Sequence, residues 1–389
     1  MNETTSLRVT SRMREFGETI FAEMSALAVA TASINLGQGF PDTDGPREVL
    51  DAAVAAICAG HNQYPPGAGV PELLQAIAQH QRRWYDVEVD PDTEVLVTAG
   101  ATEAIAAAIL ALCEPGDGVV TFEPYYDSYA ASIALAGAQR QVVQLRAPDY
   151  TFDVDDLARA VTPRTRVLLL NSPHNPTGKV FTRDELGAIA VVCREHDLVA
   201  VTDEVYEHLV FDGEHIPLAT LSNMHDRTVT ISSGGKTFSC TGWKVGWVCA
   251  SEALVAAVRT AKQFLTYVNA GPFQYGIAVG LGLPDATFHA LAADLREKRD
   301  RLTRGLVDAG LEVFPSHGTY FVTTDIRAIG EHDGLEFCRS LPERCGVVAI
   351  PNVVFYDDRD AGLPLVRFAF CKRLDVIDEA VARLKALRP

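Results

Sequence analysis

The chain has 389 residues, of which 48% are hydrophobic and 22% are charged, a composition typical of a globular protein and not of a disordered or fibrous one. Its 34 basic and 51 acidic residues give a formal net charge of -17, which disfavours binding to nucleic acid or to an anionic membrane surface. Because one hydrophobic core rarely supports a chain of this length, we expect a large and a small domain.

The N-terminus and the cysteines favour a cytoplasmic location. The first residues are polar and charged and lack the apolar stretch of a secretory signal, and no apolar run is long enough to span a bilayer. The eight cysteines are scattered singly, with no Cys-x-x-Cys pair and no histidine at metal-ligand spacing. We therefore expect reduced thiols, no disulfide framework and no metal site.

From about residue 45 to 270, short apolar runs alternate with amphipathic stretches, which is typical of βαβ units around a mostly parallel sheet. A helix is expected over 103–112, and another over 184–196, where apolar residues recur at helical spacing. The expected strands are residues 94–98, 118–122, 139–145, 166–170, 198–202 and 228–232.

After Pro284 the pattern changes to that of a smaller α+β domain. It begins with a long charged helix over 288–309 and ends with a helix that runs to Leu387. Strands are expected between them, at 319–324, 347–350 and 365–370. The predicted division is an N-terminal arm with part of the small domain (1–44), a large domain (45–280) and a C-terminal small domain (281–389).

Ligands of open α/β sheets bind beyond the carboxyl ends of the strands, so the residues after each strand are the candidates for chemistry. After the strand at 94–98, Gly100, Ala101 and Thr102 open a helix whose free N–H groups suit a phosphate, although a simple turn has the same pattern. After the strand at 166–170, two prolines stiffen a segment that can aim the Asn175 amide, although such a segment is also an ordinary turn.

Two further strand ends carry ionisable groups. Asp203 follows an apolar strand and is either a helix cap or a buried carboxylate with a cationic partner, for which a protonated pyridine nitrogen is suitable. Lys236 follows Ser233 and two glycines, which let the lysine turn inward to where burial lowers its pKa toward the nucleophilic range. Lys244 is a candidate point charge for phosphate, but a lysine in a glycine-rich loop is also a common surface residue.

Near the C-terminus, Arg367 lies inside the hydrophobic strand at 365–370. A buried guanidinium needs an anionic partner, and its planar fork fits a substrate carboxylate with two hydrogen bonds. Two alternatives also account for an arginine in this strand: it forms an internal salt bridge, or it lies on the surface of an edge strand.

Taken together and in this order, these segments resemble the class I/II aminotransferases of fold type I, which depend on pyridoxal 5′-phosphate. The resemblance extends over almost the whole chain. It rests on NLGQGFPD (35–42), NQYP (62–65), EPYYD (123–127), SPHNPTG (172–178), TDEVY (202–206), SGGKTFSCTGWKVGW (233–247) and VRFAF (366–370). One departure is Gly235, because many relatives have a bulkier residue immediately before the lysine.

The resemblance implies an α/β fold in which a large domain with a mostly parallel seven-stranded sheet, flanked by helices, binds the cofactor and a smaller α+β domain covers it. Lys236 would hold the cofactor as a Schiff base and then move the substrate proton. Asp203 would pair with the pyridine nitrogen, Asn175 and Tyr206 would hydrogen-bond the ring hydroxyl, and Tyr126 would stack on the ring. Ala101, Thr102, Ser233, Lys244 and, from the neighbouring subunit of a homodimer, Tyr64 would hold the phosphate.

The resemblance also assigns the substrate contacts. Arg367 would bind the α-carboxylate, and the Gly39 backbone would close over it. Within the superfamily the chain is most similar to a branch that contains kynurenine/glutamine aminotransferases, cysteine-conjugate β-lyases and N-succinyldiaminopimelate aminotransferase. Segments such as 21–27, 100–105 and 261–267 favour the last, with glutamate as donor and a place in lysine biosynthesis. Lys262 and Arg373 are candidate cations for a second substrate carboxylate.

Two alternatives stay open at the level of sequence. The same cofactor chemistry supports β-elimination or reaction with oxygen, as in a kynurenine, glutamine or methionine aminotransferase with cysteine-conjugate β-lyase activity. A ligand-sensing module is the non-enzymatic alternative, but the segment before residue 35 is too short for a helix-turn-helix head and the charge is acidic.

Overall fold

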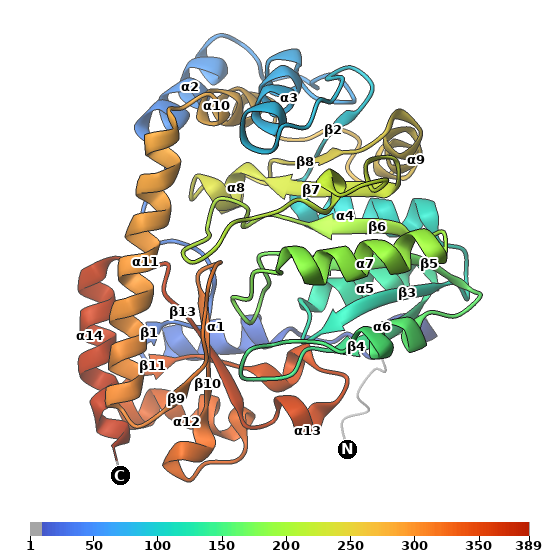
Figure 1. Ribbon diagram of the computed structural model, residues 1–389. Coiled ribbons are helices and arrows are strands. Elements are labelled where there is room, and N and C mark those ends of the chain that lie inside the picture. Colours follow the sequence, from blue (N-terminus) through green and yellow to red (C-terminus); the bar gives the residue numbers. More distant parts are fainter. Residues whose placement is uncertain (1–9, 389) are drawn as a thin grey trace, which may run out of the picture.

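The computed structural model describes residues 10–388 and contains three sheets (Figure 1). The largest has seven strands in the order β2-β8-β7-β6-β5-β3-β4, and only β8 runs antiparallel to its neighbours. Its strands are β2 (Val95–Thr98), β3 (Gly118–Glu123), β4 (Gln139–Gln144), β5 (Thr165–Asn171), β6 (Val199–Asp203), β7 (Thr228–Ser233) and β8 (Gly246–Cys249). The expected mostly parallel sheet of seven strands is confirmed.

The central strands of this sheet are buried on both faces, as their continuous apolar sequences require. In β5, Leu168 and Leu170 face the side covered by α7 (Arg183–Glu195), whereas Val167 and Leu169 face the side covered by α4 (Gly100–Leu112). Around them lie α5 (Asp127–Ala136), α6 (Val154–Ala160) and α9 (Glu252–Lys262). The outer strands β2 and β8 are covered by α2 (Arg47–Cys58), α3 (Pro71–Tyr85) and α10 (Gly271–Leu281).

Local sequence sets the ends of these helices. Thr182 and Glu185 form a reciprocal capping box at the start of α7, which satisfies backbone N–H groups that have no partner within the helix. At the end of α5, Gly137 adopts a left-handed conformation with φ 73°, which a residue without a side chain reaches at little cost.

The C-terminal part builds a four-stranded antiparallel sheet in the order β12-β13-β10-β9. Its strands are β9 (Glu312–Val313), β10 (Phe321–Asp325), β12 (Ile350–Pro351) and β13 (Leu365–Ala369), packed against α11 (Asp285–Asp308), α12 (Gly334–Cys345), α13 (Arg359–Gly362) and α14 (Leu374–Leu384). The N-terminal segment joins this part, because α1 (Ile20–Ala30) leads into β1 (Ile34–Asn35), which pairs in parallel with β11 (Val347–Val348). One continuous apolar core connects it to the large sheet.

Most expected elements are present, with ends displaced by one to three residues. Three expectations need correction. The strand expected at 319–324 starts two residues later, because Thr319 has a left-handed φ of 68°. The strand expected at 347–350 is divided into β11 and β12, which pair with different partners. The individual strands named from the sequence did not include β8, a short antiparallel strand. The predicted domain boundaries stay a prediction, and the first of those domains includes residues 1–9, outside the described residues.

Among residues 10–388, no single helix is long and apolar enough to cross a membrane. Helices α10 and α11 meet the length and composition criteria only as a pair, and they are bent by 95° at the break between them.

Candidate active site

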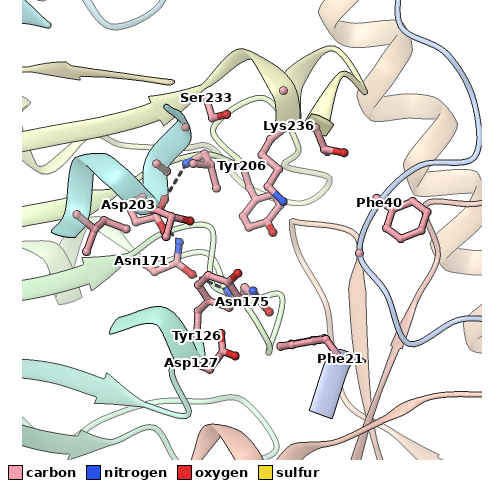
Figure 2. Close-up of a pocket in the computed structure, with 18 of the residues that line it drawn as sticks. Phe21, Phe40, Tyr126, Asp127, Asn171, Asn175, Asp203, Tyr206, Ser233 and Lys236 are labelled. Carbon is pink, nitrogen blue, oxygen red and sulfur yellow. Dashed lines mark hydrogen bonds between the residues drawn. The ribbon is translucent and has the colours of Figure 1, made fainter. Parts of the chain in front are cut away.

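A cavity of about 430 Å³ lies at the carboxyl ends of the strands of the large sheet, where it is closed on one side by residues of α1, β10 and β13. Figure 2 shows Lys236 projecting into this cavity toward Tyr206, with Asp203 and Asn171 on the sheet side and Phe21 and Phe40 on the opposite side. The cavity therefore contains groups from both sheets. Its other lining residues include Gln38, Gly39, Gly100, Ala101, Thr102, Tyr126, Asp127, Tyr129, Asn175, Ser233, Lys244, Phe321 and Arg367.

Lys236 lies in the single-turn helix α8 (Gly234–Thr237), directly after β7. Its Nζ donates a hydrogen bond to the Tyr320 hydroxyl at 3.1 Å, and that hydroxyl donates to the Gly39 carbonyl at 2.7 Å. Burial lowers the pKa of the Lys236 amine to about 8, and the opposing effect of Asp203 is smaller. A lysine with this pKa is available as a neutral amine, the form that attacks a carbonyl carbon.

Asp203 is the last residue of β6 and is buried. One carboxylate oxygen accepts a hydrogen bond from the Tyr129 hydroxyl at 2.5 Å, and no salt bridge reaches this carboxylate from the described residues. Burial raises its pKa to about 6, and the hydrogen bond from Tyr129 opposes this shift. The carboxylate therefore lacks a cation, as expected for the partner of a ligand that brings a positive charge.

Asn171 and Asn175 connect the backbone of Asp203 to the small sheet. The Asn171 side chain donates to the Asp203 carbonyl at 2.7 Å and accepts from the Asn175 backbone N–H at 2.7 Å. The Asn175 side-chain oxygen in turn accepts from Arg367 Nη1 at 2.8 Å. Because its oxygen is engaged, the amide N–H₂ is the polar group of Asn175 that remains available to a ligand in the cavity.

Arg367 occupies the middle of β13 and is 1% exposed. Its guanidinium lies 3.9 Å from the centroid of the Phe321 ring and within 5.3 Å of the Phe21 and Phe355 rings, and Nη2 donates to the Gly37 carbonyl at 3.0 Å. Burial lowers its pKa to about 10. Nε has no hydrogen-bond partner among the described residues. A buried cation with spare donors at a cavity wall is a suitable site for a carboxylate.

The opposite end of the cavity is formed by the N-terminus of α4. Ala99 provides no side-chain cap there, and Gly100, Ala101 and Thr102 of the first turn line the cavity together with Lys244 and Ser233. Gly246 of β8 lets the strand approach this turn, because a Cβ at Gly246 would lie 2.7 Å from the Gly100 carbonyl carbon. Gly235 is also closely packed, since a Cβ there would lie 3.0 Å from the Cys240 carbonyl oxygen.

Nearly all residues expected at the site line this one cavity: Gly39, Ala101, Thr102, Tyr126, Asn175, Asp203, Tyr206, Ser233, Lys236, Lys244 and Arg367. Tyr64 does not, and its side chain is 81% exposed beside Tyr267, outside the cavity. Lys262 and Arg373, the candidate cations for a second substrate carboxylate, do not line the cavity either. The Lys262 amine is buried against the Tyr267 and Gly67 carbonyls, and the Arg373 side chain pairs with Asp375 on the surface.

Sequence reasoning missed Tyr129, Asn171 and Tyr320. Each acts on an expected site residue through a hydrogen bond, and two of the three lie far along the chain from their partner. For Tyr129, the only signal in the sequence is helical spacing. Tyr129 lies three residues after Tyr126 and therefore one turn further along α5, on its buried side. Nothing in the sequence around Tyr320 indicates Lys236 as its partner.

The residues of the cavity fit pyridoxal 5′-phosphate. A buried carboxylate without a cation, a buried amine with a lowered pKa and an uncapped helix N-terminus with a lysine and a serine match a protonated pyridine, an aldehyde and a phosphate, respectively. Tyr126 also lines this cavity, next to Asn175 and Asp127 in Figure 2.

Comparison with known proteins agrees with this geometry. The model of the class I and II aminotransferase family matches residues 31–384. A probable N-succinyldiaminopimelate aminotransferase of Mycobacterium tuberculosis is 54% identical over 97% of this chain and 98% of its own, and a methionine aminotransferase of Escherichia coli is 40% identical over 97% and 98%. A mouse kynurenine–oxoglutarate transaminase is 35% identical over 95% and 88%.

The solved structures agree as well. The structure of the N-succinyldiaminopimelate aminotransferase from Mycobacterium tuberculosis superposes with a TM-score of 0.96, covering 97% of this chain and 100% of that one. An aspartate aminotransferase from Thermus thermophilus, 29% identical, superposes with a TM-score of 0.90 over 97% and 99%. The chain therefore belongs to the class I and II aminotransferases: it is an enzyme that uses pyridoxal 5′-phosphate to move amino groups between amino acids and 2-oxo acids.

Proposed function

We propose that this aminotransferase acts in lysine biosynthesis, with glutamate as amino donor and the 2-oxo acid of N-succinyl-LL-diaminopimelate as acceptor. The 54% identity to a relative named for this reaction supports the substrate pair. The observation that carries the transamination site is the meeting of Lys236, Asp203 and Arg367 in one cavity, since these groups suit an aldehyde, a pyridinium and a carboxylate.

When bound, pyridoxal phosphate supplies a pyridine ring that accepts the electrons released at the substrate α-carbon. Lys236 would bind the aldehyde carbon and, once released as a free amine, would move the α-proton with Nζ. Tyr320 holds this nitrogen, so the lysine keeps its direction in the cavity during both tasks. The lowered pKa lets the amine accept a proton near neutral pH and release it again.

Asp203 would keep the ring nitrogen protonated, with Tyr129 fixing the orientation of the carboxylate. Asn175 and Tyr206 would donate hydrogen bonds to the ring hydroxyl oxygen, and Tyr126 would cover the ring. The phosphate would be held at the start of α4 by the N–H groups of Ala101 and Thr102 together with Ser233 and Lys244.

Arg367 would bind the α-carboxylate of every substrate. Its Nη1 already donates to Asn175 and its Nη2 to Gly37, so the guanidinium is fixed before the substrate arrives. The Gly39 segment would close the cavity, because its backbone passes so near Phe321 that a Cβ at Gly39 would lie 2.3 Å from that ring. This closure would exclude water from the reacting atoms.

A donor screen tests the substrate. Purified enzyme is given 2-oxoglutarate and, separately, N-succinyl-LL-diaminopimelate, methionine, glutamine or kynurenine, and glutamate formation is measured by a coupled dehydrogenase. We expect the highest kcat/KM for the succinylated diamine. A higher value for methionine or kynurenine would reject this substrate pair and leave the aminotransferase class intact.

The second candidate is a kynurenine, glutamine or methionine aminotransferase with cysteine-conjugate β-lyase activity. The relatives at 40% and 35% identity favour it, as do the aromatic side chains of Phe21 and Phe40 at the cavity wall. Release of pyruvate and ammonia from a cysteine conjugate without any 2-oxo acid distinguishes elimination from transamination.

We also propose a homodimer in which Tyr64 of the partner subunit reaches the phosphate end of the cavity. Tyr64 and Phe264 are more than 80% exposed, and Leu265 and Tyr267 are about half exposed, so the loop surfaces around residues 64 and 264–267 carry an apolar patch of the kind that marks interfaces. Light scattering during size-exclusion chromatography should give twice the chain mass of 42.1 kDa.

The cytoplasm is the proposed compartment. All eight cysteines are free thiols, and Cys58 is exposed, which suits a reducing environment. Cell fractionation with antibody detection tests this location, and enrichment in a membrane or secreted fraction would reject it.

A further inference from the structure

A cluster of polar side chains lies outside the cofactor cavity, between α3 and the face of the large sheet formed by β7 and β8. Figure 1 shows the position of these elements. It contains His80 near the end of α3, and Glu207 and His208 in the loop after β6. We propose that these three residues form a second ligand site, for a divalent transition-metal ion such as Zn²⁺.

The donor atoms of the three residues converge. His80 Nε2 lies 2.6 Å from His208 Nε2, and one donor atom from each of the three residues lies within 4.8 Å of the other two. Two imidazole nitrogens and one carboxylate are a ligand set that Zn²⁺ takes in proteins, with a water molecule as fourth ligand. Zn–N bonds of about 2.0–2.1 Å in a tetrahedron place two nitrogens about 3.3 Å apart, so the imidazoles need to separate by less than about 1 Å.

The donors lie in a largely apolar surrounding. His80 is 1% exposed and Glu207 is 5% exposed, and the rings of Trp84, Trp247 and Phe288 lie within 6.5 Å of His80. An apolar shell of this kind limits the access of solvent to a metal site.

Two hydrogen bonds orient the carboxylate of Glu207. One oxygen accepts from the Tyr85 hydroxyl at 2.5 Å, and the other accepts from Ser232. Each oxygen keeps a further lone pair for a cation. Such hydrogen bonds from outside the ligand set are typical of metal sites, where they hold the ligands in place.

Without an ion, the cluster is incompletely satisfied. The two facing Nε2 atoms share one proton, and His80 Nδ1 has no hydrogen-bond partner among the described residues. His208 is only partly buried. A cation that replaces the shared proton would add a bond to Glu207 and relieve the crowding of the imidazoles.

The site is adjacent in sequence to the cofactor cavity. Glu207 follows Tyr206, and Ser232, which holds Glu207, precedes Ser233, while Tyr206 and Ser233 both line the cavity. A metal ion at the cluster therefore fixes the ends of β6 and β7 from the side opposite the cofactor.

The experiment uses the holoenzyme with Cys58→Ser, which removes the exposed thiol as a competing ligand. After treatment with a chelator, Zn²⁺ is titrated by calorimetry, and the Tm is measured with and without Zn²⁺. We expect one ion per chain and a higher Tm. His208→Gln and Glu207→Gln should weaken binding by at least about 10-fold and abolish the rise in Tm.

His289→Gln is the matched control, because His289 is an exposed histidine whose ring lies 5.8 Å from that of Trp84 on the same side of the molecule. It should bind Zn²⁺ like the parent. Equal binding by His208→Gln and the parent would overturn the proposal, as would no binding below about 100 µM. X-ray absorption of the Zn²⁺-loaded parent provides a test without variants, and a first shell lacking two imidazoles would also overturn it.

Discussion

At the scale of single residues, the cofactor cavity contains ionisable groups whose properties depend on what surrounds them. Lys236 has a pKa of about 8 and Asp203 a pKa of about 6, and burial is the largest cause in both cases. Both groups are thus closer to neutral than they would be in water. Burying two ionisable groups lowers the stability of the folded chain, and it does so at the place where a charged cofactor binds.

Replacing Lys236 by Met should stabilise the cofactor-free protein. The pKa of this amine falls on folding, so the unfolded chain binds a proton that the native chain releases between about pH 8 and pH 10.5. The penalty is complete below pH 8 and disappears as pH rises through this window. Urea unfolding at pH 7 should therefore show a gain of about 3 kcal/mol for Lys236→Met, which shrinks toward pH 10.5.

A gain for Lys236→Met that does not change between pH 7 and pH 10.5 would mean that packing, and not the charge, is responsible. Lys385→Met provides the control for the loss of an exposed lysine outside the cavity.

Asp203→Asn should lower kcat by about 10²–10³-fold, because an amide cannot hold a proton on the pyridine nitrogen as a carboxylate does. Tyr129→Phe should have a smaller effect in the same direction, since it removes only the hydrogen bond that orients the carboxylate. Steady-state kinetics with glutamate provide the measurement. Asp197→Asn is the control, because its side chain is 94% exposed, and equal losses in Asp197→Asn and Asp203→Asn would contradict the assignment.

At the scale of elements, the phosphate end of the cavity depends on how closely β8 approaches α4. A methyl group at Gly246 would lie 2.7–2.9 Å from backbone atoms of Gly100 and Ala101. Backbone atoms at the start of a helix cannot move aside without displacing the N–H groups that face the cavity. The antiparallel strand that the sequence did not reveal is therefore one of the elements that position the site.

Gly246→Ala should lower the free energy of unfolding by about 1–3 kcal/mol and weaken the retention of pyridoxal phosphate in dialysis. Gly187→Ala is the matched control, because Gly187 lies inside α7 with no atom within 4 Å of its Cβ position. That change should stabilise the protein by about 1 kcal/mol and leave cofactor retention unchanged. Equal cofactor retention by Gly246→Ala and the parent would show that the helix start tolerates displacement.

At the scale of the whole molecule, the small sheet supplies Arg367 and the large sheet supplies Lys236 and Asp203. The hydrogen bonds from Arg367 to Asn175 and from Tyr320 to Gly39 join the parts of the chain that surround the cavity. In the proposed homodimer, Tyr64 of the neighbouring subunit completes the cavity. An isolated chain cannot provide this contribution.

Mixing two inactive variants tests this shared site. A hybrid dimer of Tyr64→Ala and Lys236→Ala chains contains one native site, made from Lys236 of one chain and Tyr64 of the other. We expect the mixture, after dissociation and reassembly, to regain activity that neither variant has alone. If Tyr64 served its own chain, the hybrid would contain no native site and the mixture would stay inactive.

The sequence by itself predicted six of the seven strands of the large sheet, their order along the chain and several of the residues that line the cavity. These features depend on local pattern, because apolar runs form buried strands and ligands bind at the carboxyl ends of those strands. Lys236, Asp203 and Asn175 could therefore be predicted, because each lies at the end of a strand or within four residues after it.

Only the tertiary structure decided which groups act on these residues. Tyr129 reaches Asp203 across 74 positions of the chain, Tyr320 reaches Lys236 across 84, and His80 meets His208 across 128. No periodicity links residues so far apart, because packing of helices and sheets, and not chain connectivity, brings them together. The pKa values of the site depend on the same packing, since burial is a property of the folded chain alone.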